Sequence, residues 1–197
     1  QCSVRNSLAT LNIGSVMVSV PAHLSGLKKL IIPGVASTPI LINKLKANEA
    51  FPLVLDLVKQ QDISVLGICA GFQSMADSVN EFGVAEGLGW IKGAVQKITG
   101  EEACDSPLRL PHMGWNSCEI EGKSKLFHAF GKKEIDLYFA HSYYFEVSDR
   151  SSVVATTMYG RELDVAVESE NIFGVQFHPE KSGLLGLSIL QNFYEKC

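Results

Sequence analysis

A cysteine, a histidine and a glutamate are present in contexts where they could act together in nucleophilic catalysis. Cys69 stands between two glycines in the turn 67–71, and His178 and Glu180 are two residues apart, so in an extended stretch they share a face. A thiolate nucleophile needs a base that takes and returns a proton, and the base needs an anion that fixes its tautomer. Cys69, His178 and Glu180 fit these roles. The alternatives are a buried structural cysteine and an ordinary loop histidine.

The elements around Cys69 predict how its side chain is presented. Residues 63–68 are mostly apolar and β-branched, which is typical of a buried parallel strand, and residues 72–77 begin a helical pattern. Gly67 and Gly71 lack the Cβ atoms that would collide where the strand meets the helix. We therefore expect the sulfur of Cys69 over the N-terminus of that helix, whose positive end favours a thiolate.

Two backbone segments are candidates for stabilising the negative charge that develops on an attacked amide oxygen. The first is the N–H group of Ala70, directly after the nucleophile. The second is Val35 or Ala36, because the apolar strand at 30–32 runs into a Pro-Gly pair and a loop. The same pair is also compatible with a simple turn.

The remaining periodicity predicts an α/β fold that positions these residues. Helical spacing is found at residues 3–11, at 184–194, and at 40–58, where Pro52 divides it into two pieces. Strands are predicted at 15–20, 30–32, 91–98, 137–145 and 151–158, and a hairpin joins 164–168 to 172–177. Because a doubly wound domain normally opens on a strand, we expect the first strand to be absent from this sequence. The order predicts one domain over residues 1–197, with a mixed, mostly parallel sheet flanked by helices and a flavodoxin-like core.

Composition argues against several classes of partner. The 197 residues are 46% hydrophobic and carry a formal net charge of -4 with dispersed charges, which argues against nucleic acid. No apolar run approaches the roughly 18 residues of a membrane span. The cysteines are odd in number and form no C-x-x-C pair, which fits reduced thiols: Cys2, Cys69, Cys104, Cys118 and Cys197. We predict a cytoplasmic protein without a membrane partner, a metal or another cofactor.

The motifs around Cys69 and His178 resemble those of the class I, or triad, glutamine amidotransferases. Two further motifs, at residues 111–116 and 138–144, resemble the glutaminase subunit of imidazole glycerol phosphate synthase. The four motifs cover nearly the whole chain in order. The resemblance implies that Cys69 attacks the side-chain amide of L-glutamine, that ammonia leaves, and that water hydrolyses a glutamyl thioester. It also implies that His178 moves the protons and that Glu180 orients His178.

The resemblance further implies a substrate site and a partner. The partner is a (β/α)8 cyclase, expected as a heterodimer, which receives the ammonia through its barrel in histidine biosynthesis. Residues expected at the glutamine are Gln73, Ser142, Tyr143, Gly34, Val35 and Ala70, with Glu81 as an additional candidate. Residues expected to face the cyclase are Pro111, His112, Met113, Trp115 and Asn116, which the local pattern alone predicts as a loop with an exposed aromatic side chain.

Three alternatives share parts of this pattern. Related glutaminases supply ammonia to a sugar-amidinating partner in surface-polysaccharide synthesis. A stand-alone cysteine hydrolase would use the same fold, and a catalytically silent subunit would keep the partner surface alone. In addition, Ala36 stands where the family usually has glycine, and alanine adopts a positive φ less readily.

Overall fold

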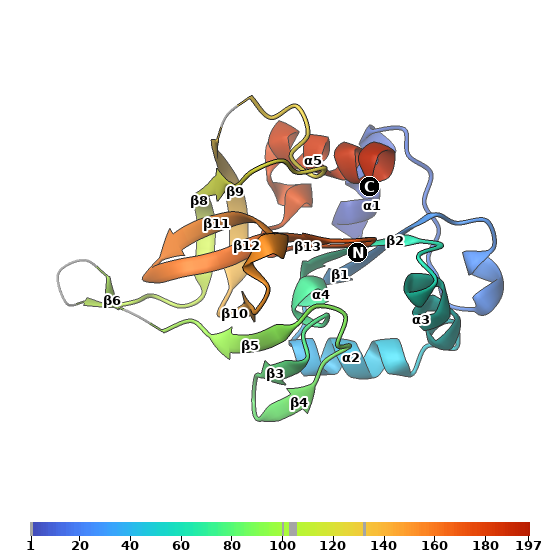
Figure 1. The fold of residues 1–197 in the computed structure, drawn as a ribbon, viewed down its shortest axis with the longest axis horizontal. Coiled ribbons are helices and arrows are strands. Elements are labelled where there is room, and N and C mark those ends of the chain that lie inside the picture. The colour runs from blue at the N-terminus through green and yellow to red at the C-terminus, as the bar shows by residue number, and fades with distance from the viewer. Residues whose placement is uncertain (1, 100, 103–105, 132) are drawn as a thin grey trace.

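Helices cover both faces of the seven-stranded sheet that contains strand β2 (Ser64–Cys69) (Figure 1). The computed structural model describes residues 2–99, 101–102, 106–131 and 133–197. Helices α1 and α5 lie on one face of the sheet, and α2, α3 and α4 lie on the other (Figure 1). The helices are α1 (Cys2–Thr10), α2 (Thr38–Lys46), α3 (Phe51–Lys59), α4 (Ala70–Gln73) and α5 (Gly183–Lys196), with short 3-10 turns η1 (Pro21–Leu24), η2 (Arg150–Ser152) and η3 (Pro179–Lys181).

The strand order of this sheet combines a parallel part and an antiparallel part. In order, the strands are β1 (Lys29–Gly34), β2 (Ser64–Cys69), β13 (Ile172–Val175), β12 (Arg161–Ser169), β11 (Val153–Tyr159), β8 (His112–Ile120) and β9 (Glu134–His141). Strands β1, β2 and β13 are parallel, and every other neighbouring pair is antiparallel. The predicted mixed sheet with flanking helices is confirmed, although its parallel part is confined to three strands. Short connections, such as those around β12, join antiparallel strands because they cannot hold a crossover helix.

A smaller sheet lies beside α4. Its strands, in order, are β10 (Tyr143–Val147), β5 (Gly93–Lys97), β3 (Ser78–Asn80) and β4 (Val84–Glu86). A separate two-stranded sheet is formed by β6 (Glu101–Glu102) and β7 (Ser106–Pro107). The β3–β4 hairpin was not predicted. The single strand predicted at 137–145 is divided, because Ser142 leaves the ladder and its carbonyl accepts a hydrogen bond from Ile98 N at 3.0 Å. The chain thus passes from the large sheet to the small one at Ser142.

The N-terminal third differs from the prediction in two places. Residues 15–20 do not form a strand: the chain there runs along a cavity of about 940 Å³ at the free edge of β1, with Val16 and Met17 exposed. A strand needs a ladder partner for its backbone groups, and this segment has none among the described residues. The two helical pieces are confirmed, but the break falls at residues 47–50. Pro52 lies in the first turn of α3, where no helical N–H bond is required.

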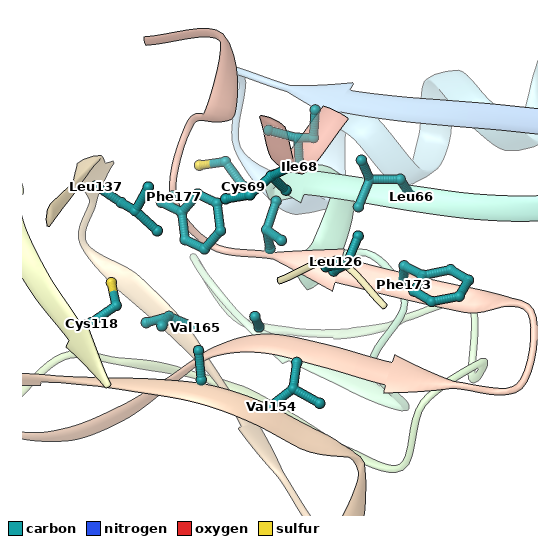
Figure 2. Packing of buried hydrophobic residues seen from close by; sticks show 14 of the residues in the cluster. Leu66, Ile68, Cys69, Cys118, Leu126, Leu137, Val154, Val165, Phe173 and Phe177 are labelled. Atoms are coloured by element: carbon teal, nitrogen blue, oxygen red, sulfur yellow. The ribbon is translucent and has the colours of Figure 1, made fainter. Parts of the chain in front are cut away.

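Alternation along the central strands divides the buried side chains into two clusters. One cluster packs against α1 and α5, and Figure 2 shows part of it, with Cys69 beside Ile68 and Phe177. The other packs against α2, α3 and α4 and includes Phe72 and Phe145. Cys69 is therefore held at the end of a strand that is buried on both faces. No helix in the described part of the chain is long and apolar enough to cross a membrane.

Candidate active site

The backbone at Cys69 forms a sharp turn between β2 and α4. Cys69 adopts φ 54° and ψ -114°, a conformation that non-glycine residues rarely take. A Cβ atom on Gly71 would lie 1.8 Å from the carbonyl oxygen of Ile32, and one on Gly67 would lie 2.7 Å from Cα of Phe72. The predicted strand, turn and helix are present, but α4 has only four residues, so its dipole at Cys69 is weaker than that of the predicted helix.

The structure brings Cys69, His178 and Glu180 together. His178 follows β13 after a short extended segment, and its backbone N–H donates a hydrogen bond to the backbone carbonyl of Tyr138 in β9 at 2.8 Å. Its Nδ1 donates to Glu180 Oε1 at 2.9 Å, and the side chains are 4% and 5% exposed. The Cys69 side chain also interacts with the imidazole and raises the pKa of His178. The arrangement is that of a nucleophile, a base and an orienting anion.

Electrostatics favour a protonated His178 beside an ionised Glu180. Burial alone lowers the pKa of His178, but the hydrogen bonds and negative charges of Cys69 and Glu180 outweigh it and raise the pKa to about 9. Burial raises the pKa of Glu180, but His178 outweighs this effect and the net pKa is lowered. Glu180 Oε2 is buried without a hydrogen-bond partner among the described residues. The carboxylate therefore depends on His178 for most of its stabilisation.

A network of buried amides also reaches Cys69. Gln73 Nε2 donates to the carbonyl of Tyr143 at 2.6 Å and to Gln176 Oε1 at 2.8 Å, and Gln73 Oε1 accepts from Thr38 Oγ1 at 2.8 Å. Gln176 Nε2 in turn lies 3.6 Å from Cys69 Sγ. Both N–H groups of the Gln73 side chain are thus engaged with acceptors of the protein itself.

Sequence reasoning missed two members of this network, Thr38 and Gln176. The available signal for Gln176 was its position two residues before His178, which places both side chains on one face of an extended segment. No comparable signal marked Thr38, since it reaches Gln73 only through the packing of α2 on α4.

The loop after β1 lies close to the turn at Cys69. Gly34 is opposite Cys69 in the ladder of β1 and β2, and a Cβ atom on Gly34 would lie 2.5 Å from Gly71 N. Val35 and Ala36 follow with exposed side chains. The loop ends at Thr38, whose N–H donates to Glu81 Oε2 at 2.7 Å. Glu81 therefore caps α2 and fixes the end of this loop.

The segment predicted as a partner-facing loop is instead the beginning of strand β8. Its side chains alternate: Met113 and Trp115 are 64% and 59% exposed, whereas His112 is 3% exposed. His112 does not lie on the surface, because its Nδ1 is 3.0 Å from His141 Nε2 in the interior. Pro111 is exposed, and Asn116 is half-buried.

His112 and His141 form a neutral buried pair. Burial lowers the pKa of His112 to about 4 and that of His141 to about 3. His141 Nδ1 donates to the carbonyl of Tyr143 at 2.9 Å, so its Nε2 accepts from His112 Nδ1. His112 Nε2 accepts from Asn116 Nδ2 at 3.2 Å. These contacts join the start of β8 to the carbonyl that also holds Gln73.

No group of three or more His, Cys, Asp or Glu side chains in the described ranges is arranged to hold a metal ion. Cys2, Cys69, Cys118 and Cys197 are free thiols, and Cys104 lies outside the described residues.

Residues 3–197 match the family described as glutamine amidotransferase class-I. The chain belongs to this family. This amidotransferase is 38% identical to imidazole glycerol phosphate synthase subunit HisH of Leptospira borgpetersenii, over 95% of this chain and 91% of the relative. It is 38% identical to the subunit of the same name from Pelagibacter ubique (strain HTCC1062), over 97% and 92% of the two chains. The fold matches a crystal structure of a glutamine amidotransferase with TM-score 0.74 and 22% identity, over 98% and 92% of the chains.

Proposed function

We propose that this chain is the glutaminase subunit of an imidazole glycerol phosphate synthase, which hydrolyses L-glutamine and passes ammonia to a cyclase in histidine biosynthesis. The observation that carries the proposal is the buried contact of Cys69, His178 and Glu180 at a glycine-flanked turn. The family and the relatives named HisH support it. A reduced Cys69 thiol is required for this chemistry, which fits the cytoplasmic location that the sequence predicts.

In the first step, the Cys69 thiolate attacks the side-chain carbonyl carbon of glutamine. The oxygen becomes negative, and the N–H of Ala70 is available to it, since the first N–H groups of a helix have no partner within that helix. A second donor comes from the loop after Gly34. His178 is protonated at neutral pH, because its pKa is raised to about 9, and it delivers its proton to the departing nitrogen. The C–N bond breaks, ammonia leaves, and a glutamyl thioester on Cys69 remains.

In the second step, His178 acts as a base. It has lost its proton to ammonia, and acylation removes the negative sulfur that helped to raise its pKa. Neutral His178 then takes a proton from water, which attacks the thioester carbonyl. The C–S bond breaks, the new carboxylic acid loses its proton to solvent as glutamate leaves, and the Cys69 thiolate and protonated His178 are restored. Glu180 holds the imidazole in one tautomer throughout.

The exposed side chains of β8 form the surface that we assign to the cyclase. Met113 is opposite Ala140 in the ladder with β9, and Trp115 is opposite Tyr138, against which its ring packs edge-on with the centroids 6.1 Å apart. The carbonyl of Ala140 is 3.9 Å from Cys69 Sγ. The exposed apolar surface and the nucleophile are therefore adjacent across one strand. A partner seated on Met113 and Trp115 would receive ammonia close to where it is released, shielded from water.

Glutamate release tests this function. The chain is assayed with glutamine alone, then with a (β/α)8 cyclase subunit and its nucleotide ligand. We expect a large rise in glutamate release with the loaded cyclase, and loss of the activity in Cys69→Ala. Absence of a rise, with Cys69 still chemically reactive, would reject the cyclase as the partner.

A further inference from the structure

We propose that the side-chain amide of Gln176 donates a hydrogen bond to the Cys69 thiolate and that Gln73 sets the orientation of that amide. The inference rests on Cys69 being the nucleophile of the proposed function. It adds a residue outside the Cys69, His178 and Glu180 set that touches the reacting sulfur. Gln176 Nε2 lies 3.6 Å from Cys69 Sγ, within hydrogen-bonding distance for sulfur, and the Gln176 side chain is fully buried.

The orientation of the Gln176 amide follows from an obligate acceptor at the other end of the network. A backbone carbonyl can only accept, so the Gln73 atom 2.6 Å from the carbonyl of Tyr143 is its nitrogen. The second hydrogen of that nitrogen points to Gln176, which must present its oxygen at 2.8 Å. The remaining group of Gln176, its NH2, therefore faces the sulfur. The assignment does not depend on an arbitrary choice between amide oxygen and nitrogen.

The far end of Gln73 is held by Thr38. Gln73 Oε1 is an acceptor, so the Thr38 hydroxyl at 2.8 Å donates to it. Thr38, Gln73 and Gln176 are 0%, 4% and 0% exposed, so water does not compete for these groups. The oxygen and the nitrogen of each side-chain amide both have a hydrogen-bond partner. A flip of either amide would leave buried polar groups unpaired. The NH2 group of Gln176 is consequently fixed toward Cys69.

An N–H group directed at sulfur stabilises a thiolate more than a neutral thiol. A thiol sulfur is a weak acceptor, whereas hydrogen bonds to an ionised acceptor are about twice as strong as neutral ones. Helix α4 has only four residues, so its dipole makes a limited contribution at this position. Gln176 and His178 are two residues apart after the end of β13, and both interact with the Cys69 side chain. The amide of Gln176 thus offers a donor to the charged sulfur and holds the sulfur in place.

The test measures alkylation of Cys69 by iodoacetamide between pH 5 and pH 10, in the absence of glutamine, with peptide mass spectrometry to separate Cys69 from the other cysteines. We expect Gln176→Leu, which removes the donor, to move the midpoint of the pH–rate curve upward by about one to two pH units. Gln176→Glu keeps the shape and replaces the NH2 group by a carboxylate oxygen, so we expect an upward shift here too. The control is Gln60→Leu, an exposed glutamine at the end of α3, which should leave the midpoint unchanged.

Each outcome decides one part of the inference. A lower melting temperature without a midpoint shift in folded Gln176→Leu and Gln176→Glu would show that Gln176 only fills space, and would overturn the proposal. Thr38→Val tests the contribution of Thr38 to holding Gln73, and we expect a smaller upward shift than in Gln176→Leu. No shift in Thr38→Val would overturn the contribution of Thr38 alone. Because alkylation needs neither glutamine nor a partner, failure here is distinguishable from failure of the proposed function, which glutamate release reports.

Discussion

His178 Nδ1 lies 2.9 Å from Glu180 Oε1, and the two side chains are almost completely buried. The second carboxylate oxygen, Oε2, has no hydrogen-bond partner among the described residues. A buried carboxylate with one satisfied oxygen is stable only while the imidazole beside it is charged or donates a hydrogen bond. The ionised form of Glu180 therefore depends on the hydrogen bond from His178.

Replacing Glu180 by Gln tests the role of this anion. The amide keeps the shape but removes the charge that helps to raise the pKa of His178 and that fixes its tautomer. We expect kcat for glutamine hydrolysis to fall on the order of 10²–10⁴-fold, measured as glutamate release with the cyclase present. Glu195→Gln, on the exposed side of α5, is the control and should retain activity. Wild-type kcat in Glu180→Gln would remove Glu180 from the mechanism.

The pKa of His178 also predicts a pH dependence of stability. It is raised from 6.5 to about 9, so between these values the folded protein holds a proton that the unfolded chain lacks. The resulting stabilisation is complete below pH 6.5 and is lost as the pH rises through about 9. In urea unfolding, the stability difference between wild type and His178→Gln should thus shrink from pH 6 to pH 9, by on the order of 2 kcal/mol. A difference that is constant or grows with pH would contradict the raised pKa.

The close packing of the turn at Cys69 means that one added methyl group at Gly71 should lower the stability of the fold strongly. In Gly71→Ala the new Cβ would lie 1.8 Å from the backbone oxygen of Ile32, which cannot move without breaking the sheet. We expect the free energy of unfolding to fall by about 3 kcal/mol or more, measured by urea denaturation. Gly14→Ala is the matched control, because its Cβ would meet no atom within 4 Å. Equal stability of the two variants would mean that the turn is looser than described.

The exposed aromatic side chain of Trp115 on β8 should contribute to binding of the cyclase. Trp115→Ala should weaken binding of the cyclase subunit by about 30-fold or more, since a central aromatic residue at an interface typically contributes about 2 kcal/mol. Binding is measured by isothermal titration calorimetry. Tyr194→Ala provides a control aromatic of similar exposure on α5, 53% against 59%. If the two variants bind the cyclase equally well, the partner lies on another face.

Parts of the site that depend on residues close together in the sequence could be predicted from sequence patterns. The turn at Cys69 depends on adjacent glycines and an apolar strand, and the link from His178 to Glu180 spans two residues, so both could be predicted from the sequence. The network from Thr38 to Gln176 could not be predicted, because its members are up to 138 residues apart and meet only after α2, α4 and the segment after β13 have packed.

Strand pairing explains most of the remaining differences. Residues 15–20 have the composition of a strand but no ladder partner among the described residues, so they remain irregular. Residues 112–120 contain Gly and Asn, which favour loops, yet β9 and β11 hold them in the large sheet. Alternation within that strand then turns His112 inward, which no prediction of a loop could anticipate.

Covalent labelling shows whether Cys69 is a nucleophile directed at glutamine. The protein is incubated with a glutamine-like diazoketone, with the loaded cyclase present, and its intact mass is measured. We predict one adduct per chain, located on Cys69, slowed by excess glutamine and absent from Cys69→Ala. No adduct, or equal labelling of wild type and Cys69→Ala, would contradict the claim and would leave a subunit that only binds its partner.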